Sequence, residues 1–294
     1  MNCFDDFDAW GDAISGANLR LACDAVELRR WTLGRVHLGG VALQLASEGG
    51  GNICYGANSH AGTMLFLPLS YAAGHVVNGE SLDDDSVFVI PQNADFQIHV
   101  RRRAHSWCSI ALPFDVTHAA CRVAHDADAV RRLKQLVGSI AASIINDSSE
   151  TAAHHAAGRA LAAAAAACLA PSAPPSRVIG RPRLDRSTIV RNAMAILDSS
   201  TVMPTTAELA QALQVTSRTL LRTFREVFGL PPKQYLLLRE LHLVRRALRS
   251  ASPDDATVAE VLTRHGIWEF GRFAARYRRQ FGELPSETLE GPRG

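Results

Sequence analysis

The sequence predicts an α+β protein of two domains, an N-terminal antiparallel β-barrel with packed helices and a C-terminal all-α domain. Short runs of alternating or β-branched residues, separated by turn residues, fill about 31–112, which is typical of an antiparallel barrel or sandwich. Helical periodicity dominates the rest of the chain, and a proline- and serine-rich segment at 171–176 interrupts it. We therefore expect domains at 1–170 and 184–294, joined by a linker at 171–183.

Composition bounds the class of protein. The 294 residues are 47% hydrophobic and 20% charged, which is ordinary for a folded chain of about two domains. No run approaches the ~20 apolar residues of a membrane span, and the acidic N-terminus lacks a basic leader. We expect a cytoplasmic protein with no membrane partner. Six scattered cysteines without a C-x-x-C pair favour reduced structural thiols over a disulfide frame or a zinc site.

The N-terminal domain begins with about 30 residues in which we expect a tail and a helical stretch. Glycines at 49–51 mark a turn within the barrel, and helices are expected over about 115–170. Those helices, at 126–145 and 151–169, have apolar or small-residue surfaces that could pack on the barrel, on each other or on a second chain. The barrel strands are expected at 35–38, 41–45, 63–67, 86–90, 96–100 and 107–112.

A small β-barrel can enclose one small ligand. Because about half of the strand residues face inward, aromatic and histidine side chains here are candidate ligand contacts, with plain core as the alternative. These candidates are Tyr55, Phe66, Tyr71, His75, Phe88, His99 and Trp107. The histidines form no H-x-H pair and no His/Glu cluster of the spacing that a metal-dependent barrel enzyme uses. We therefore expect no metal, no other cofactor and no catalytic residues.

Two helical patterns lie back to back between Thr205 and Gly229. In the first, Leu209, Ala210 and Leu213 share one face, and Thr205 or Thr206 can cap it. The second follows Thr216 and has apolar residues on one side and arginines on the other. A short helix, a tight turn and a second helix with an arginine face predict a helix-turn-helix. Any small helical hairpin with a charged face looks similar, so this unit alone leaves both interpretations open.

Repetition favours the DNA-binding interpretation. Residues 257–282 repeat the layout, with a turn glycine at Gly266 and arginines on the polar face, and both units end in Phe-Gly followed by Leu-Pro. One continuous helix at 233–249 joins the units, so both second helices could enter successive major grooves of one duplex. The part after residue 171 holds 19 basic and 12 acidic residues, a net charge of +7, whereas residues 1–171 hold 12 and 17, a net charge of −5. A basic C-terminal part fits nucleic-acid binding.

These motifs resemble the DNA-binding domain of the AraC/XylS family of bacterial transcription regulators, over roughly 184–289. The first unit carries the family's pattern at Leu209-Ala210, Thr216, Leu220, Arg222, Phe224, Gly229, Pro232, Tyr235-Leu236 and Arg239. The second carries it at Gly266, Phe273, Arg279, Phe281-Gly282 and Pro285-Ser286-Glu287. Ile267 departs from the usual Phe, and Trp268 stands where many members have a capping Ser or Asn. This tryptophan variant is similar to members of the ethanolamine-operon-regulator type.

The resemblance implies a cupin-like N-terminal barrel that binds a small effector and mediates homodimerisation, and a C-terminal domain that binds double-stranded promoter DNA and recruits RNA polymerase. The chain would then be an effector-controlled transcription activator. The residues expected to carry DNA binding are Arg218, Leu221 and Arg222 on bases, Arg225 on phosphate, Arg272 on bases, and Arg276 and Arg279 on phosphate. The second helix is expected to read fewer bases and to depend more on shape and phosphates. Two alternatives stay open: a cupin-like small-molecule enzyme, and a regulator whose N-terminal domain only dimerises.

Overall fold

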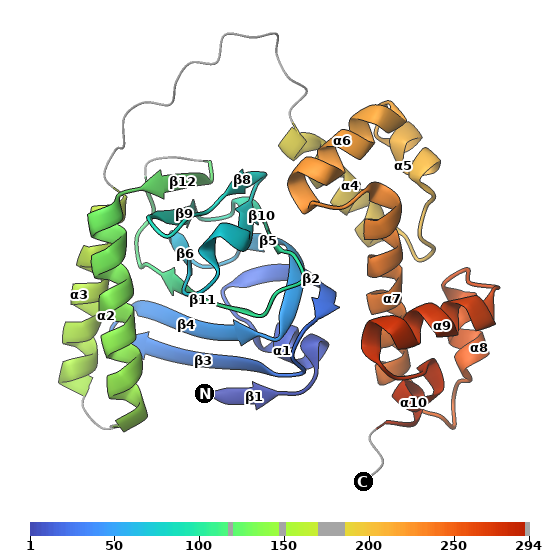
Figure 1. Cartoon of the computed structure of the whole chain (residues 1–294), viewed down its shortest axis with the longest axis horizontal. Helices are drawn as coiled ribbons and strands as arrows, with labels where there is room; N and C mark the ends of the chain where they lie inside the picture. The colour runs from blue at the N-terminus through green and yellow to red at the C-terminus, as the bar shows by residue number, and fades with distance from the viewer. Residues whose placement is uncertain (117–119, 147–150, 170–185, 292–294) are drawn as a thin grey trace. The chain divides into compact units, whose positions relative to one another are not determined.

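The computed structural model describes residues 1–116, 120–146, 151–169 and 186–291 (Figure 1). The chain divides into two compact units, Met1–Gly180 and Arg181–Gly294. The linker expected at 171–183 lies outside the described residues.

The N-terminal unit is built from antiparallel strands and a few helices. Its helical elements are α1 (Phe7–Ala13), η1 (Ala72–Gly74), α2 (Ala127–Asn146) and α3 (Thr151–Cys168). Its strands are β1 (Asn2–Phe4), β2 (Ala17–Val26), β3 (Trp31–Leu38), β4 (Val41–Glu48), β5 (Gly50–Asn58), β6 (Met64–Pro68), β7 (His75–Val77), β8 (Glu80–Ser81), β9 (Ser86–Ile90), β10 (Asp95–Val100), β11 (His105–Ala111) and β12 (Arg122–His125).

The described strands form two sheets, with no single sheet closed into a barrel. A seven-stranded sheet has the order β1-β3-β4-β11-β6-β9-β12, and a five-stranded sheet has the order β2-β5-β10-β7-β8. The predicted α+β class, the antiparallel strands and the two-domain organisation are confirmed. The closed barrel is corrected to a pair of sheets that share one interior.

All six predicted strands are present, as β3, β4, β6, β9, β10 and β11. The helical stretch expected before residue 30 is only the short α1, because β2 follows it with alternating inward Leu19 and Leu21. The turn expected at Gly49-Gly51 is reduced to a bend at Gly49, and β5 already begins at Gly50. A side chain at Gly50 would come within 1.9 Å of the Ala25 carbonyl oxygen, so these glycines allow β5 to lie unusually close to β2.

The seven-stranded sheet has two apolar faces, because successive side chains of each strand point to opposite faces and apolar residues occupy both. One face packs on the predicted helices, which are confirmed as α2 and α3. Leu43, Leu65 and Ile110 of the sheet share a buried cluster with Leu133 of α2 and Leu161 of α3. The other face shares a second cluster with α1 and the five-stranded sheet. The helices therefore bury their apolar faces within the chain, and their part in dimerisation stays a prediction.

The C-terminal unit is entirely helical within its described residues. Its helices are α4 (Arg186–Ser199), α5 (Thr206–Ala212), α6 (Ser217–Phe228), α7 (Pro232–Ser250), α8 (Val258–Arg264), α9 (Phe270–Phe281) and α10 (Pro285–Glu290). The long helix α7 runs between the two groups of helices, with α5 and α6 near one end and α8 and α9 near the other (Figure 1). In the described part of the chain, no helix is long and apolar enough to cross a membrane.

Candidate nucleic-acid interface and ligand cavity

Each helix-turn-helix unit opens with the same capping arrangement. The hydroxyl of Thr205 accepts a hydrogen bond from the Glu208 backbone N–H at 3.2 Å, and the Glu208 carboxylate accepts one from the Thr205 N–H at 2.7 Å. Thr257 and Glu260 repeat both bonds at 3.2 and 2.8 Å. Such a reciprocal capping box satisfies two backbone donors that a helix start otherwise leaves free. The sequence repeat is therefore a structural repeat.

The turns also match. Gln214 lies nine residues after Thr205, and Gly266 lies nine residues after Thr257; both have left-handed backbones, with φ of 54° and 74°. The next backbone N–H bonds back to the first helix in each unit, from Val215 to the Ala210 carbonyl and from Ile267 to the Leu262 carbonyl, both at 3.0 Å. Only glycine adopts this conformation without cost.

The units differ by one residue at the start of the second helix. In the first unit Thr216 follows Val215 at once and caps α6, with its hydroxyl 3.1 Å from the Thr219 backbone N. In the second unit Trp268 is an extra residue, and the cap position falls on Glu269, which makes no side-chain capping bond. Trp268 is 72% exposed. The extra residue therefore places a large aromatic side chain in solvent beside the start of α9.

The predicted base readers of α6 lie on its outer side. Leu220, Phe224 and Val227 are buried, whereas Arg218 and Arg225 are exposed. Arg222 is also exposed, and its Nε donates to Glu226 at 2.9 Å, while the predicted contact Leu221 is half-buried. The structure thus brings the three arginines and Leu221 together on one helix.

The arginines of α9 are placed less uniformly. Arg272 and Arg279 are exposed, and Arg272 donates to both carboxylate oxygens of Glu269 at 2.8 and 2.9 Å. Arg276 is only half-buried, and its charge partly offsets the burial that raises the pKa of Glu240 on α7. Aligned by their buried residues, the α9 positions matching Arg218 and Arg222 are Gly271 and Ala275. The exposed surface of α9 is accordingly less basic at its start.

A shared core fixes the two recognition helices on α7. Near its start, Tyr235 stacks on Phe228 of α6 with ring centroids 4.5 Å apart. Farther along, Leu241 and Val244 share a buried cluster with Phe273 and Tyr277 of α9. Because protein interiors are close-packed, α6 and α9 are held in one rigid relationship by the same helix.

The N-terminal unit contains a cavity of about 50 Å³ between its two sheets. Its walls are mainly apolar side chains of β2, β6, β9 and β10, with Trp10 of α1. Its polar lining residues are Ser15, Gln44, Glu48, Asn52, His105 and Ser109. An apolar cavity with a few placed polar groups is the usual form of a small-molecule site.

Two of the seven predicted ligand contacts, Phe66 and Trp107, line this cavity. The other five do not belong to its lining. Phe88 lies in the surrounding core, and Tyr71 is 44% exposed at the surface. Tyr55 and His99 occupy strand positions that alternate with the inward-facing Cys54 and Ile98, so the pleat turns them to the other face of the five-stranded sheet. His75 lies behind His105, with ring centroids 4.9 Å apart.

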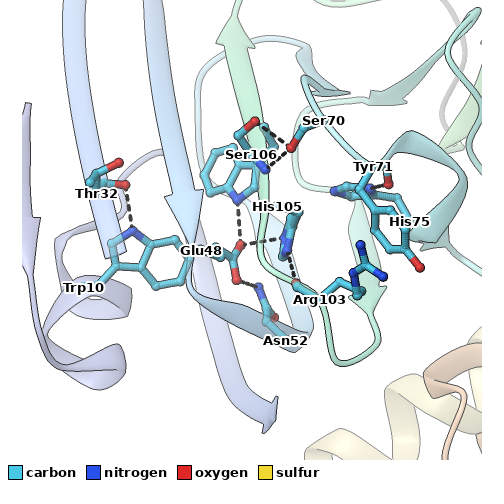
Figure 2. Close-up of polar contacts among 11 residues, drawn as sticks. Trp10, Thr32, Glu48, Asn52, Ser70, Tyr71, His75, Arg103, His105 and Ser106 are labelled. Atoms are coloured by element: carbon cyan, nitrogen blue, oxygen red, sulfur yellow. Dashed lines mark hydrogen bonds and ion pairs between the residues drawn. The ribbon is translucent and has the colours of Figure 1, made fainter. Parts of the chain in front are cut away.

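The polar end of the cavity is a buried network around Glu48 (Figure 2). Its Oε1 accepts a hydrogen bond from Trp107 Nε1 at 2.6 Å and lies 3.3 Å from His105 Nε2. Its Oε2 accepts from Asn52 Nδ2 at 2.7 Å. Both side chains of the Glu48–His105 pair are 1% exposed. Both oxygens of the carboxylate thus face donors.

The two histidines beside the cavity have opposite protonation preferences. His105 donates from Nδ1 to the Arg103 carbonyl at 3.0 Å and from Nε2 to Glu48, so both nitrogens act as donors. Burial opposes its charge, but the charge and hydrogen bond of Glu48 raise its pKa overall. His75 donates from Nδ1 to the Tyr71 carbonyl at 3.0 Å. Burial, together with the neighbouring His105 charge, lowers the pKa of His75 to about 4.

Sequence reasoning missed Glu48, Asn52, Gln44 and His105 as cavity residues. One pattern could have indicated Gln44, because it lies between the apolar Leu43 and Leu45 of a predicted strand and faces the opposite side. Glu48 lies on the same side as Gln44, but it falls beyond Leu45, the predicted end of that strand. Asn52 follows the glycines at 49–51, which were expected to form a turn, so it was not assigned to a strand. Within the described ranges, no group of three or more His, Cys, Asp or Glu side chains could hold a metal ion.

Comparison with known proteins identifies the C-terminal unit. Residues 209–291 match the family model described as "Helix-turn-helix domain". The chain is 37% identical over 81 residues to the XylDLEGF operon transcriptional activator of Pseudomonas putida, covering 28% of this chain and 25% of that protein. It is 34% identical over 102 residues to the probable thc operon regulatory protein of Rhodococcus erythropolis, covering 34% of this chain and 31% of that protein. The chain thus spans about a quarter to a third of these relatives.

Two solved structures also resemble the chain. An AraC-type transcriptional regulator from Chromobacterium violaceum is 21% identical with a TM-score of 0.33, covering 37% of this chain and 96% of that one. ToxT from Vibrio cholerae is 9% identical with a TM-score of 0.32, covering 94% of this chain and 99% of that one.

The capped repeat, the shared α7 core and the sequence matches all fall on one domain. The C-terminal unit therefore contains a helix-turn-helix domain that is similar in sequence to those of operon regulators such as the XylDLEGF operon transcriptional activator.

Proposed function

We propose that the chain is a sequence-specific DNA-binding transcription activator, controlled by a small molecule that binds between the sheets of its N-terminal domain. One observation carries the DNA-binding part: two capped helix-turn-helix units share α7 as a common core, and the first presents Arg218, Arg222 and Arg225 to solvent. Two rigidly joined recognition helices suit two successive major grooves. The relatives named as operon activators support the direction of regulation.

We propose that α6 and α9 contribute differently to DNA recognition. Arg218 and Arg222 of α6, with Leu221, contact base edges, because an arginine can bond a guanine through two donors, and Arg225 contacts phosphate. On α9, Arg272 contacts bases, while Arg276 and Arg279 contribute charge toward phosphates. The weak capping of α9 and its Gly271 and Ala275 positions support a smaller role in base readout.

The proposed effector site is the cavity around Glu48. It lies between the sheets, and its apolar walls end in polar groups that could orient one molecule. We further propose that the N-terminal unit forms a homodimer and that the DNA-bound protein contacts RNA polymerase. The exposed outer faces of α2 and α3 are the surface proposed for the second chain; mass measurement over a concentration series tests this.

A gel-shift titration of the full chain on DNA from upstream of its own gene tests the function. Specific binding should resist competitor DNA, and its affinity should fall as salt rises, with a slope of about −0.9 per phosphate contact. Absence of salt-sensitive binding, both there and in a selection from random DNA, would refute the proposal.

A further inference from the structure

The amide of Asn52 has a fixed orientation inside the cavity. The Glu48 carboxylate, which receives donors on both oxygens, lies 2.7 Å from Asn52 Nδ2, so the amino group of the amide must face it. The remaining atom, Oδ1, therefore points elsewhere as an acceptor. Asn52 is only 7% exposed, and its Oδ1 is buried without a hydrogen-bond partner among the described residues. A buried acceptor without a donor costs about 1–3 kcal/mol.

The other polar groups of the lining have partners. Gln44 Nε2 donates to the Ser15 carbonyl at 2.8 Å and to Ser109 Oγ at 3.2 Å, and its Oε1 accepts from the Ser15 N–H at 3.1 Å. Glu48 and His105 satisfy each other with their neighbours. Of the lining side chains in the described part of the chain, Asn52 alone has a buried nitrogen or oxygen without a partner. The lining of the cavity therefore contains one acceptor that lacks a donor.

The charges at this end of the cavity already balance. His105 lies against Glu48, and neither Lys nor Arg occurs among the described residues that line the cavity. A carboxylate ligand would be buried beside Glu48 with no cation of its own, and a cationic ligand would find the lining carboxylate already paired. Because an unpaired buried charge is far more costly than a buried neutral group, an uncharged ligand fits best.

The size and walls of the cavity limit the ligand further. A water needs roughly 10–15 Å³ of such space, so about 50 Å³ accommodates only a small molecule, against walls that include Leu21, Phe96 and Ile98. We propose that the cavity takes a small uncharged alcohol, whose apolar body packs between the sheets and whose hydroxyl donates to Asn52 Oδ1. This proposal rests on the proposed function, in which the cavity is the effector site.

Two matched sets of probes test the ligand class with the full chain. In calorimetric titrations at pH 7, benzyl alcohol is compared with benzylamine, benzoate and toluene, and 1-butanol is compared with butylamine and butyrate. At least one alcohol should bind, about tenfold or more tightly than the amine and the carboxylate of its set. Equal or tighter binding of an amine or a carboxylate would overturn the assignment, as would failure of both alcohols to bind.

A variant pair tests the contact itself. Asn52→Leu removes the acceptor at nearly constant volume, and should weaken benzyl alcohol binding about tenfold while toluene binding is kept or improved. Asn18→Leu, the same change at an exposed position of β2, should leave both unchanged. Loss of toluene binding together with alcohol binding would count against the contact and indicate a damaged cavity.

Gel shifts on the same samples test the ligand proposal and the proposed DNA-binding function separately. If the protein binds DNA but no alcohol, the ligand class is wrong while DNA binding stands. If alcohol binds but changes neither the specificity nor the affinity of DNA binding, the cavity is a ligand site that does not control DNA binding.

Discussion

The carboxylate of Glu48 on β4 lies 3.3 Å from Nε2 of His105 on β11, with both side chains buried between the sheets. The backbone positions of these residues pair directly across the two strands, with Glu48 opposite His105 in the register. The sheet register therefore places this ion pair, and Trp107 and Asn52 complete its hydrogen bonds. The pair organises the polar end of the cavity.

Removal of one partner should be costly. Glu48→Leu leaves His105 buried without its anion, and we expect it to lower the free energy of unfolding by about 3–5 kcal/mol. The double variant Glu48→Leu/His105→Leu, which removes both charges, should lose clearly less than the single variant. Urea unfolding, monitored by tryptophan fluorescence, measures these two variants and His105→Leu, and a double variant as unstable as the sum of the two single variants would contradict a coupled pair.

His75 should make the domain sensitive to acid. Its folded pKa is lowered to about 4, so the unfolded chain binds this proton first, and the contribution is present above about pH 6.5 and lost as pH falls toward 4. The full effect is about 3 kcal/mol. His75→Phe should therefore flatten the loss of unfolding free energy between pH 6.5 and 4, whereas the exposed control His37→Phe should follow the unaltered chain.

His105 should show the opposite dependence. Its folded pKa is raised, so its contribution is fully present below about pH 6.5, the unfolded value, and is lost as pH rises through the folded value. Glu48→Gln removes the anion that raises this pKa and should abolish the loss on the alkaline side. NMR titration of the His105 ring should show the corresponding fall in its pKa; an unchanged value would rule out Glu48 as the cause.

The arginines should separate into two kinds of DNA contact. Arg222→Ala should cost about 1–3 kcal/mol on the selected site and little on unrelated DNA, since a base contact carries discrimination. Arg279→Ala should weaken both alike and reduce the salt slope by about 1. Filter binding at several salt concentrations, with Arg30→Ala at an exposed position of the N-terminal unit as control, distinguishes them; identical losses for the two variants would refute the division.

Trp268 should contact thymine methyl groups, because it is exposed beside the start of a recognition helix, where base edges are read. Trp268→Ser should weaken binding to the selected site. Replacing individual thymines by deoxyuridine removes the methyl group, and at the contacted position it should weaken the unaltered protein but not the variant. Leu28→Ser, an exposed apolar site of the N-terminal unit, should not change either affinity. If no thymine position distinguishes the two proteins, the contact is elsewhere.

The sequence by itself determined the C-terminal domain. Capping threonines, apolar spacing and Phe-Gly stops are local, and helices form from contacts a few residues apart, so the order of α5 to α9 and the arginine face of α6 could be predicted. What it did not reveal was the left-handed backbone of Gln214, because a residue other than glycine rarely adopts that conformation.

Only the tertiary structure decided the cavity. The alternation of β4 and β11 was readable, but which face is inward and which residues meet depend on pairing between strands far apart in sequence, such as Glu48 with His105 and β2 with β5. A shift of one residue reverses every side chain of a strand, which is why Tyr55 and His99 turned away from the cavity that Asn52 and Ile98 line. The sequence determined how the chain could bind DNA; non-local register determined what its N-terminal domain can hold.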